Sequence, residues 1–241
     1  MSKGRKGPGF RKKRSTASSG RNLHTRVKTA KRRKTSSTRW LQRQLNDPYV
    51  TAAQKDGYRS RAAYKLIELN DRFQFLKPGL NVVDLGAAPG GWSQVVLETL
   101  GDDALQGPSK VVALDILKMD PLPGVDLLTL DFMAGEAPDL IKSKLSGKAG
   151  LVLSDIAPSL TGHTQTDHLR IMAVVEAAYY FACEVLAPDG CFIAKVFQGG
   201  TEQDLLGEMK QRFRSVKHAK PPASRAESSE VFVVAQGYRE P

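Results

Sequence analysis

One stretch of the sequence, residues 82–92, limits the fold more than any other. It reads VVDLGAAPGGW, an apolar run followed by six residues that are all Gly, Ala or Pro. The apolar run is typical of a buried parallel strand, and residues 93–100 carry apolar side chains at helical spacing. A strand, a glycine-rich turn and a helix in this order predict the ligand-binding corner of a doubly wound α/β sheet. Glycine there lets the backbone approach a ligand, and the helix start offers free N–H groups.

The pattern of this loop favours S-adenosylmethionine over a dinucleotide. Ala88 stands where the dinucleotide pattern G-x-G-x-x-G requires its second glycine. The next strand-end acid, Asp115, also lies farther from Asp84 than the roughly 20 residues of the nicotinamide pattern. An acidic strand end before such a loop suits a nucleoside that carries an amino acid, although a tight turn without a ligand is the alternative. The glycines expected at this site are Gly86, Gly90 and Gly91.

Charge divides the chain into two parts. Residues 1–40 contain 15 Lys or Arg and no Asp or Glu, so 21 basic residues remain in 41–241 against 25 acidic ones, a balance of −4. A segment this basic and this poor in large apolar groups is expected to be disordered. We therefore predict a disordered RNA-binding tail at 1–37 and one folded domain at 38–241, with a solubility tail and a mitochondrial transit peptide as alternatives.

Other features of the composition indicate the compartment. No run of about 18 apolar residues is present, so no membrane span is expected. Cys183 and Cys191 match no metal or redox spacing, and both lie in apolar segments. They are expected to be buried free thiols in a reducing compartment. The sequence thus predicts a cytoplasmic protein without a metal site, and we expect a monomer.

Strands and helices alternate through the predicted domain. Ser60 is expected to cap a helix over 61–73, whose apolar stripe leaves Lys65 beside it. Alternation predicts a largely parallel sheet with helices on both faces and an antiparallel pair closing one edge. The expected strands are 82–85, 110–116, 126–132, 151–154, 191–197, 215–218 and 230–235, and later helices are expected at 168–186 and 203–213.

Three acids stand at or just after the carboxyl ends of predicted strands: Asp115, Asp131 and Asp155. That edge of an open α/β sheet is where ligands bind. Any one of these acids could simply stabilise a turn. Three of them beside a glycine-rich loop indicate a ligand-binding site. Asp115 is expected to accept hydrogen bonds from ribose hydroxyls, and Asp131 from an adenine amino group.

Lys195 interrupts the apolar strand FIAKVF. Because burying an ammonium is costly, such a lysine needs a partner or a function. Asp155 on the neighbouring strand is a candidate partner, and a lysine that reaches solvent at the strand end is the alternative. Glu230, at the start of the last predicted strand, is likewise expected to have a partner or a function.

Together these segments resemble the FtsJ/RrmJ family of ribosomal RNA 2′-O-methyltransferases. The resemblance runs from about Ser37 to Gly237 and includes SRAAYKL at 60–66, SDIAP at 154–158, KVFQG at 195–199 and SEV at 229–231, besides the glycine-rich loop. It implies a Rossmann-like methyltransferase fold with a seven-stranded, mostly parallel sheet and one antiparallel strand near the edge. The implied catalytic tetrad is Lys65, Asp155, Lys195 and Glu230, and the implied contacts to S-adenosylmethionine are Gly90, Trp92, Asp115, Asp131 and Asp155.

The resemblance also implies a reaction. It is methyl transfer to the 2′-hydroxyl of a uridine in 23S ribosomal RNA, on an assembled or nearly assembled large subunit, with Lys195 as the proton acceptor. Burial and Lys65 favour neutral Lys195, whereas Asp155 and Glu230 favour its charged form. The long basic tail is not part of the resemblance.

Other functions leave signatures that this chain lacks. Amino-group methylases carry an Asn/Asp-Pro-Pro-aromatic turn, but residues 155–158 read DIAP. Pyrimidine-carbon methylases need a cysteine nucleophile in a strand-end loop, and neither cysteine has that position. No tyrosine precedes a lysine by four residues, as a short-chain dehydrogenase would require. The remaining alternative is a non-catalytic, RNA-binding ribosome assembly factor with a methyltransferase fold.

Overall fold

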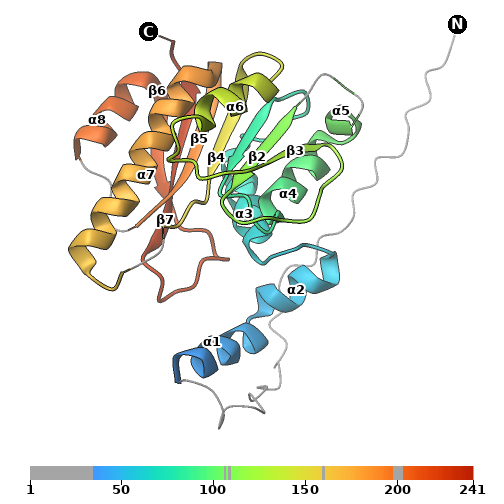
Figure 1. Cartoon of the computed structure of the whole chain (residues 1–241), viewed down its shortest axis with the longest axis vertical. Coiled ribbons are helices and arrows are strands. Elements are labelled where there is room, and N and C mark those ends of the chain that lie inside the picture. The colour runs from blue at the N-terminus through green and yellow to red at the C-terminus, as the bar shows by residue number, and fades with distance from the viewer. Residues whose placement is uncertain (1–34, 106, 108–109, 159–160, 198–202, 241) are drawn as a thin grey trace, which may run out of the picture.

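The computed structural model describes residues 35–105, 107, 110–158, 161–197 and 203–240. Its centre is a seven-stranded sheet in the order β3-β2-β1-β4-β5-β7-β6 (Figure 1). All neighbours from β3 to β5 are parallel, whereas β7 is antiparallel to both β5 and β6. The strands are β1 (Val82–Leu85), β2 (Val111–Asp115), β3 (Val125–Thr129), β4 (Ala149–Ser154), β5 (Leu186–Phe197), β6 (Phe213–Ala219) and β7 (Glu230–Tyr238).

Helices cover both faces of this sheet. One core cluster joins α2, α3, α4 and α5 to one face, and the other joins α6, α7 and α8 to the opposite face. The helix α1 precedes α2 at the lower end of the view in Figure 1. The helices are α1 (Thr35–Asn46), α2 (Pro48–Asp56), α3 (Ala62–Phe73), α4 (Gly91–Leu100), α5 (Asp102–Leu105), α6 (Ala137–Lys144), α7 (Thr164–Val185) and α8 (Gln203–Arg212).

Alternation along the strands decides which polar side chains meet. On β5, Phe192, Ala194 and Val196 belong to the core under α7, whereas Cys191 and Ile193 belong to the core under α3 and α4. Since successive side chains of a strand point to opposite faces, Lys195 follows Ile193 onto the α3 side. By the same alternation Glu230 precedes Phe232 on the α3 side of β7. Because β7 is antiparallel, its first residue lies at the carboxyl edge of the parallel strands.

The predicted fold class is confirmed: the sheet has seven strands, is mostly parallel, and has its antiparallel strand next to the edge. Several boundaries differ from prediction. β5 begins at Leu186 instead of residue 191, because Leu186 pairs with Ala149 of β4 before the irregular segment at Pro188. The helices α5 and α6 were missed, since α5 has only four residues and Pro138 opens the short α6.

The expected cap at Ser60 is wrong. The residue at the N-cap of α3 is Arg61, and no side chain caps this helix. The Ser60 hydroxyl is buried without a hydrogen-bond partner among the described residues, close to the start of α4.

Nearly all of the predicted tail lies outside the described residues. The first described helix, α1, begins at Thr35 and therefore runs across the expected boundary at 37 and 38. No helix in the described part of the chain is long and apolar enough to cross a bilayer.

Candidate active site

Lys195 and Asp155 form a buried ion pair at the carboxyl edge of the sheet. Lys195 Nζ lies 2.9 Å from Asp155 Oδ1 and donates a 2.7 Å hydrogen bond to the main-chain oxygen of Asp155. Only 8% of Lys195 is exposed, so its ammonium would be costly to bury without these two acceptors. The pair joins the two residues that the sequence indicated as possible partners.

Lys65 and Glu230 form the second pair. Lys65 Nζ contacts both carboxylate oxygens, at 2.7 Å from Oε1 and 2.8 Å from Oε2, and Ser224 Oγ donates to Oε1 at 2.8 Å. Burial raises the pKa of Glu230, but the Lys65 ammonium and the hydrogen bonds outweigh burial and hold it below its ordinary value. Glu230 is therefore ionised at neutral pH.

The two pairs belong to one cluster. Phe232 lies opposite Lys195 in the register of β5 and β7, and Glu230 lies two residues before Phe232 on the same face. The ring of Phe232 is 5.7 Å from Lys65 Nζ. The charge of Lys195 also helps to lower the pKa of Glu230. The fold thus brings all four predicted catalytic residues together, two cations against two acids.

The glycines of the loop permit close packing around this cluster. Gly86 has φ +77°, and a Cβ there would lie 2.7 Å from the main-chain nitrogen of Ile156, the residue after Asp155. A Cβ on Gly91 would lie 2.4 Å from Ser60 Oγ. Gly90 is the N-cap of α4 at φ +106°. The loop therefore lies directly against β4 and the start of α3, with its main chain at the carboxyl edge.

Trp92 is placed differently from the other predicted contacts. Its side chain is only 3% exposed and packs against Phe232, with ring centroids 5.7 Å apart. The indole N–H donates to the main-chain oxygen of Ala62 at 2.9 Å. A ligand at the loop would therefore meet the main chain of Trp92, in the first turn of α4, instead of its ring.

Asp115 is the last residue of β2, Asp131 follows the neighbouring strand β3, and both organise the loops there. Asp115 Oδ2 accepts from the main-chain N–H of Ala88 at 2.8 Å, which ties the end of β2 to the glycine-rich loop. Its Oδ1 accepts from Leu117 N. Asp131, two residues beyond the end of β3, is exposed and accepts from Met133 N at 2.9 Å. Both carboxylates keep further lone pairs for a ligand.

Asp84 is the fully buried acid behind the loop. Its Oδ2 accepts a 2.6 Å hydrogen bond from Ser93 Oγ, and its Oδ1 has no partner among the described residues. Burial raises the pKa of Asp84 to about 7, the Ser93 hydroxyl opposes this, and the charges of Asp155 and Asp115 raise it further. This carboxyl therefore titrates near neutral pH.

Sequence reasoning missed two supporting residues, Arg59 and Ser224. The Arg59 guanidinium donates to three main-chain oxygens, those of Pro89 at 3.3 Å, Asp120 at 2.6 Å and Pro121 at 2.9 Å. It thereby joins the glycine-rich loop to the loop after β2. The only sequence signal was a basic residue next to SRAAYKL, and nothing in the pattern pointed to Ser224, six residues before Glu230.

The carboxyl edge fits S-adenosylmethionine by its chemistry. It offers main-chain N–H groups at the start of α4 and carboxylates at Asp115 and Asp131. Large apolar side chains are exposed directly after these acids, with Ile116 66%, Leu117 65% and Met133 51% accessible. Such groups suit a nucleoside with hydroxyls and a flat base. Among the described residues, no group of three His, Cys, Asp or Glu side chains could hold a metal ion.

Comparison with known proteins decides the family. The sequence model of FtsJ-like methyltransferases matches residues 58–238. The chain belongs to the FtsJ-like methyltransferase family. All four residues of the charged cluster, the glycine-rich loop and both strand-end acids lie inside the matched range of this FtsJ-like methyltransferase. Helices α1 and α2 precede it.

Relatives of this FtsJ-like methyltransferase share one name. The chain is 61% identical over 223 residues to "Ribosomal RNA large subunit methyltransferase E" of Paramagnetospirillum magneticum, covering 92% of this chain and 91% of the relative. It is 57% identical over 239 residues to the protein of the same name from Rhodospirillum rubrum, covering 99% and 90%. A crystal structure of a ribosomal RNA methyltransferase from Plasmodium falciparum superposes with a TM-score of 0.65 at 29% identity, covering 75% of this chain and 98% of that one.

Proposed function

We propose that this FtsJ-like methyltransferase transfers a methyl group from S-adenosylmethionine to the 2′-hydroxyl of a uridine in 23S ribosomal RNA, on an assembled or late-assembling large subunit. The observation that carries the proposal is the buried Lys195–Asp155 pair, set beside Lys65 and Glu230 and next to the glycine-rich loop. The shared name of the relatives supports the same substrate class. A non-catalytic assembly factor would not need this cluster.

The cofactor is assigned to the carboxyl edge. When bound, S-adenosylmethionine supplies a methyl group on a sulfonium, which is already activated for displacement. The main chain of the loop and of Trp92 would hold the cofactor, Asp115 would accept hydrogen bonds from its ribose hydroxyls, and Asp131 would accept one from its adenine amino group. Asp155 would contact both the cofactor and Lys195. The residues assigned to the cofactor are Gly86, Gly90, Gly91, Trp92, Asp115, Asp131 and Asp155.

Lys195 is assigned the role of accepting the proton of the 2′-hydroxyl. Its Nζ donates one hydrogen bond to the main-chain oxygen of Asp155 and lies 2.9 Å from Oδ1 of the same residue. In its neutral form, the amine keeps a lone pair for the incoming hydroxyl. Lys195 then accepts the hydroxyl proton as the oxygen attacks, and Asp155 stabilises the ammonium that forms.

Lys65 and Glu230 are assigned a positioning role. Lys65 is fixed by both oxygens of Glu230, and Ser224 fixes Glu230 in turn. Lys65 Nζ can therefore orient the ribose of the target nucleotide without a rearrangement of its own. In-line displacement depends strongly on alignment, so such orientation supplies a large part of the rate enhancement.

The remaining parts of the proposal concern partners. Residues 1–37 provide sequence-independent RNA affinity, because they are rich in Lys and Arg and contain no acid. The folded domain selects the nucleotide. We place the reaction in the cytoplasm, where large subunits assemble, and assign it to a monomer, since all four proposed catalytic residues come from one chain.

Transfer of labelled methyl groups to large subunits that lack the modification tests the proposal. Wild type, Lys195→Ala and the control Lys148→Ala are compared, and the labelled nucleoside is identified after digestion. Lys148 is half-exposed next to the opposite end of β4, where it bonds to Glu184. We expect 2′-O-methyluridine from wild type and the control, and almost none from Lys195→Ala. A folded wild type that binds S-adenosylmethionine without transfer would support the assembly factor instead.

A further inference from the structure

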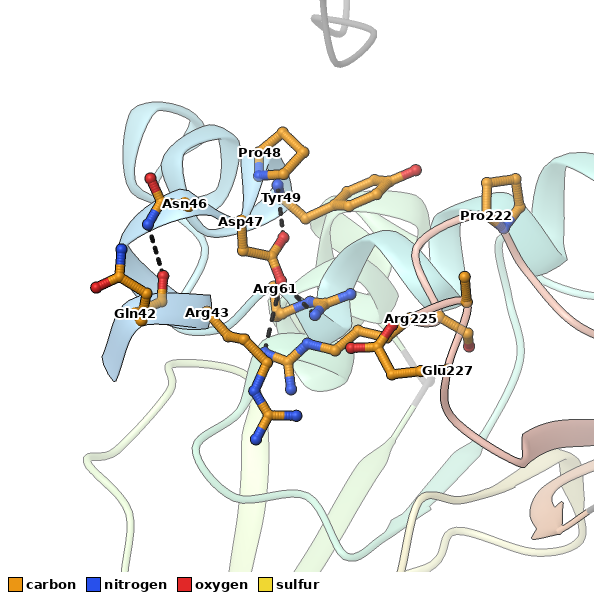
Figure 2. A pocket seen from close by; sticks show the side chains of 12 residues that line it. Gln42, Arg43, Asn46, Asp47, Pro48, Tyr49, Arg61, Pro222, Arg225 and Glu227 are labelled. Atoms are coloured by element: carbon orange, nitrogen blue, oxygen red, sulfur yellow. Dashed lines mark hydrogen bonds and ion pairs between the residues drawn. The ribbon is translucent and has the colours of Figure 1, made fainter. Parts of the chain in front are cut away.

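A cavity of about 460 Å³ is lined by residues from the N-terminal helices and from a loop near the C-terminus (Figure 2). Its walls come from α1, α2, the first residue before α3, and the loop 220–229 between β6 and β7. Three arginines line it: Arg43, Arg61 and Arg225. Figure 2 shows these side chains gathered at one place, although they come from three separate segments of the chain.

Asp47 holds two of the three arginines in position. It forms an ion pair with Arg61 and lies 3.5 Å from Arg225 Nη2. Arg61 also donates to the main-chain oxygen of Ala223, and its guanidinium lies 5.7 Å from the ring centroid of Tyr49. The Asp47 side chain is only 9% exposed, so the arginines are organised before any ligand arrives.

The cavity carries a net positive charge. Its lining includes three arginines but only two acids, Asp47 and Glu227. Among the described residues, no carboxylate forms an ion pair with the exposed Arg43. An anion is therefore the favoured ligand. The basic tail of this chain is excluded as an occupant, because its charge has the same sign.

The cavity shares a wall with the catalytic cluster. Ser224 lines the cavity, and its hydroxyl donates to Glu230. Arg61 lines it too and lies one helical turn before Lys65. An RNA chain whose target ribose lies at Lys195 and Lys65 would continue past this wall. The anion in the cavity is therefore expected to be a phosphate group of the same RNA.

We propose that this arginine pocket binds a phosphodiester group of the RNA nucleotide next to the methylated one. The inference rests on the proposed function, which supplies RNA as the substrate. Guanidinium groups bind phosphate oxygens in pairs. The volume suits one nucleotide, and the apolar surfaces of Tyr49 and Pro48 can contact its ribose or base. Arg43, Asp47 and Tyr49 precede the range matched by the family model, so part of this site is added by the N-terminal helices.

Kinetics with large subunits as substrate test the pocket. We compare Arg43→Ala and Arg225→Ala with the control Arg214→Ala, whose side chain is 63% exposed and pairs with Asp189 at the opposite edge. Each pocket variant is expected to raise the KM for the subunit about tenfold, the loss of one charged contact. Each should also lower the salt slope of RNA binding by about one. Affinity for S-adenosylmethionine, measured by calorimetry, is expected to stay at the wild-type value, and the control to match wild type throughout.

Cross-linking separates this proposal from the proposed function, because it requires binding but not turnover. A photoreactive benzoylphenylalanine at position 43 of the full chain is irradiated on the large subunit, and the cross-linked nucleotide is mapped. We expect an immediate neighbour of the methylated uridine. Cross-links confined to distant nucleotides, or wild-type KM and salt slope in both variants, would overturn the pocket assignment. Failure of wild type to transfer methyl, with RNA still cross-linked at the pocket, would overturn the reaction alone.

Discussion

The buried carboxyl of Asp84 makes the free energy of unfolding depend on pH, and the substitution Asp84→Asn should remove this dependence. The pKa of Asp84 is about 7 in the folded chain, against an ordinary value of 3.8. Between these values the folded state binds a proton that the unfolded state has lost, so stability falls as pH rises from about 4 to about 7. A difference of about three pH units corresponds to about 4 kcal/mol. Asp84→Asn keeps the shape and an acceptor for Ser93 but cannot ionise.

We therefore expect Asp84→Asn to match wild type near pH 4 and to exceed it by up to about 4 kcal/mol above pH 7. Urea unfolding at several pH values from 4 to 8 measures this difference, and the other titrating groups cancel because both proteins carry them. Ser93→Ala is the companion variant. It removes the hydroxyl that lowers the pKa of Asp84, so stability should go on falling beyond pH 7. A difference between wild type and Asp84→Asn that is constant with pH would refute the reasoning.

Three further predictions concern the loop, the second ion pair and the tail. Gly86→Ala should cost about 3 kcal/mol in urea unfolding, because its Cβ would lie 2.7 Å from Ile156 N at φ +77°. Gly79→Ala, at φ +83° in open space, should cost only about 1 kcal/mol. Since the pKa of Glu230 is lowered, its stabilisation is present above pH 4.5 and lost in acid. Glu230→Gln should therefore be about 2 kcal/mol less stable at pH 7, with a deficit that shrinks below pH 4.5; an unchanged deficit there would contradict this. Residues 1–34 hold 14 of the 36 Lys and Arg residues. The RNA affinity of wild type is expected to fall about 10³-fold or more between 50 and 200 mM salt, and deleting residues 1–34 should make this fall smaller. An unaltered salt dependence in filter binding would show that the tail does not bind RNA.

Strand periodicity and strand-end chemistry made much of the fold predictable. The apolar runs placed β1, β2 and β4 to within a residue or two, because strands buried on both faces are continuous in hydrophobicity. The same reasoning marked Lys195 as abnormal, since a charged residue inside such a run has few structural explanations. That Lys195 shares one cluster with Lys65 and Glu230 was implied by the family resemblance and not by periodicity.

Contacts between distant segments could not be predicted in this way. Ser60 has the right residue type for a helix cap, yet the close approach of α4 at Gly91 places its hydroxyl elsewhere. The arginine pocket depends on Asp47 meeting Arg61 and Arg225, which are far apart in the sequence. Short-range sequence patterns do not predict contacts between residues that are distant in the sequence. Helix α6 was lost for another reason, because it is short and opens with proline.

The position of β7 has a consequence for how the protein is made. This strand lies between β5 and β6 although it follows both in the sequence, and it supplies Glu230. A growing chain that has not yet reached Glu230 therefore has β5 and β6 unjoined and Lys65 without its carboxylate. Such an unfinished chain exposes the unpaired edge of β5, which can form hydrogen bonds with strands of other chains and so promote aggregation. Methylating activity and protection against aggregation should then arise at the same moment of synthesis, when the last strand enters the gap.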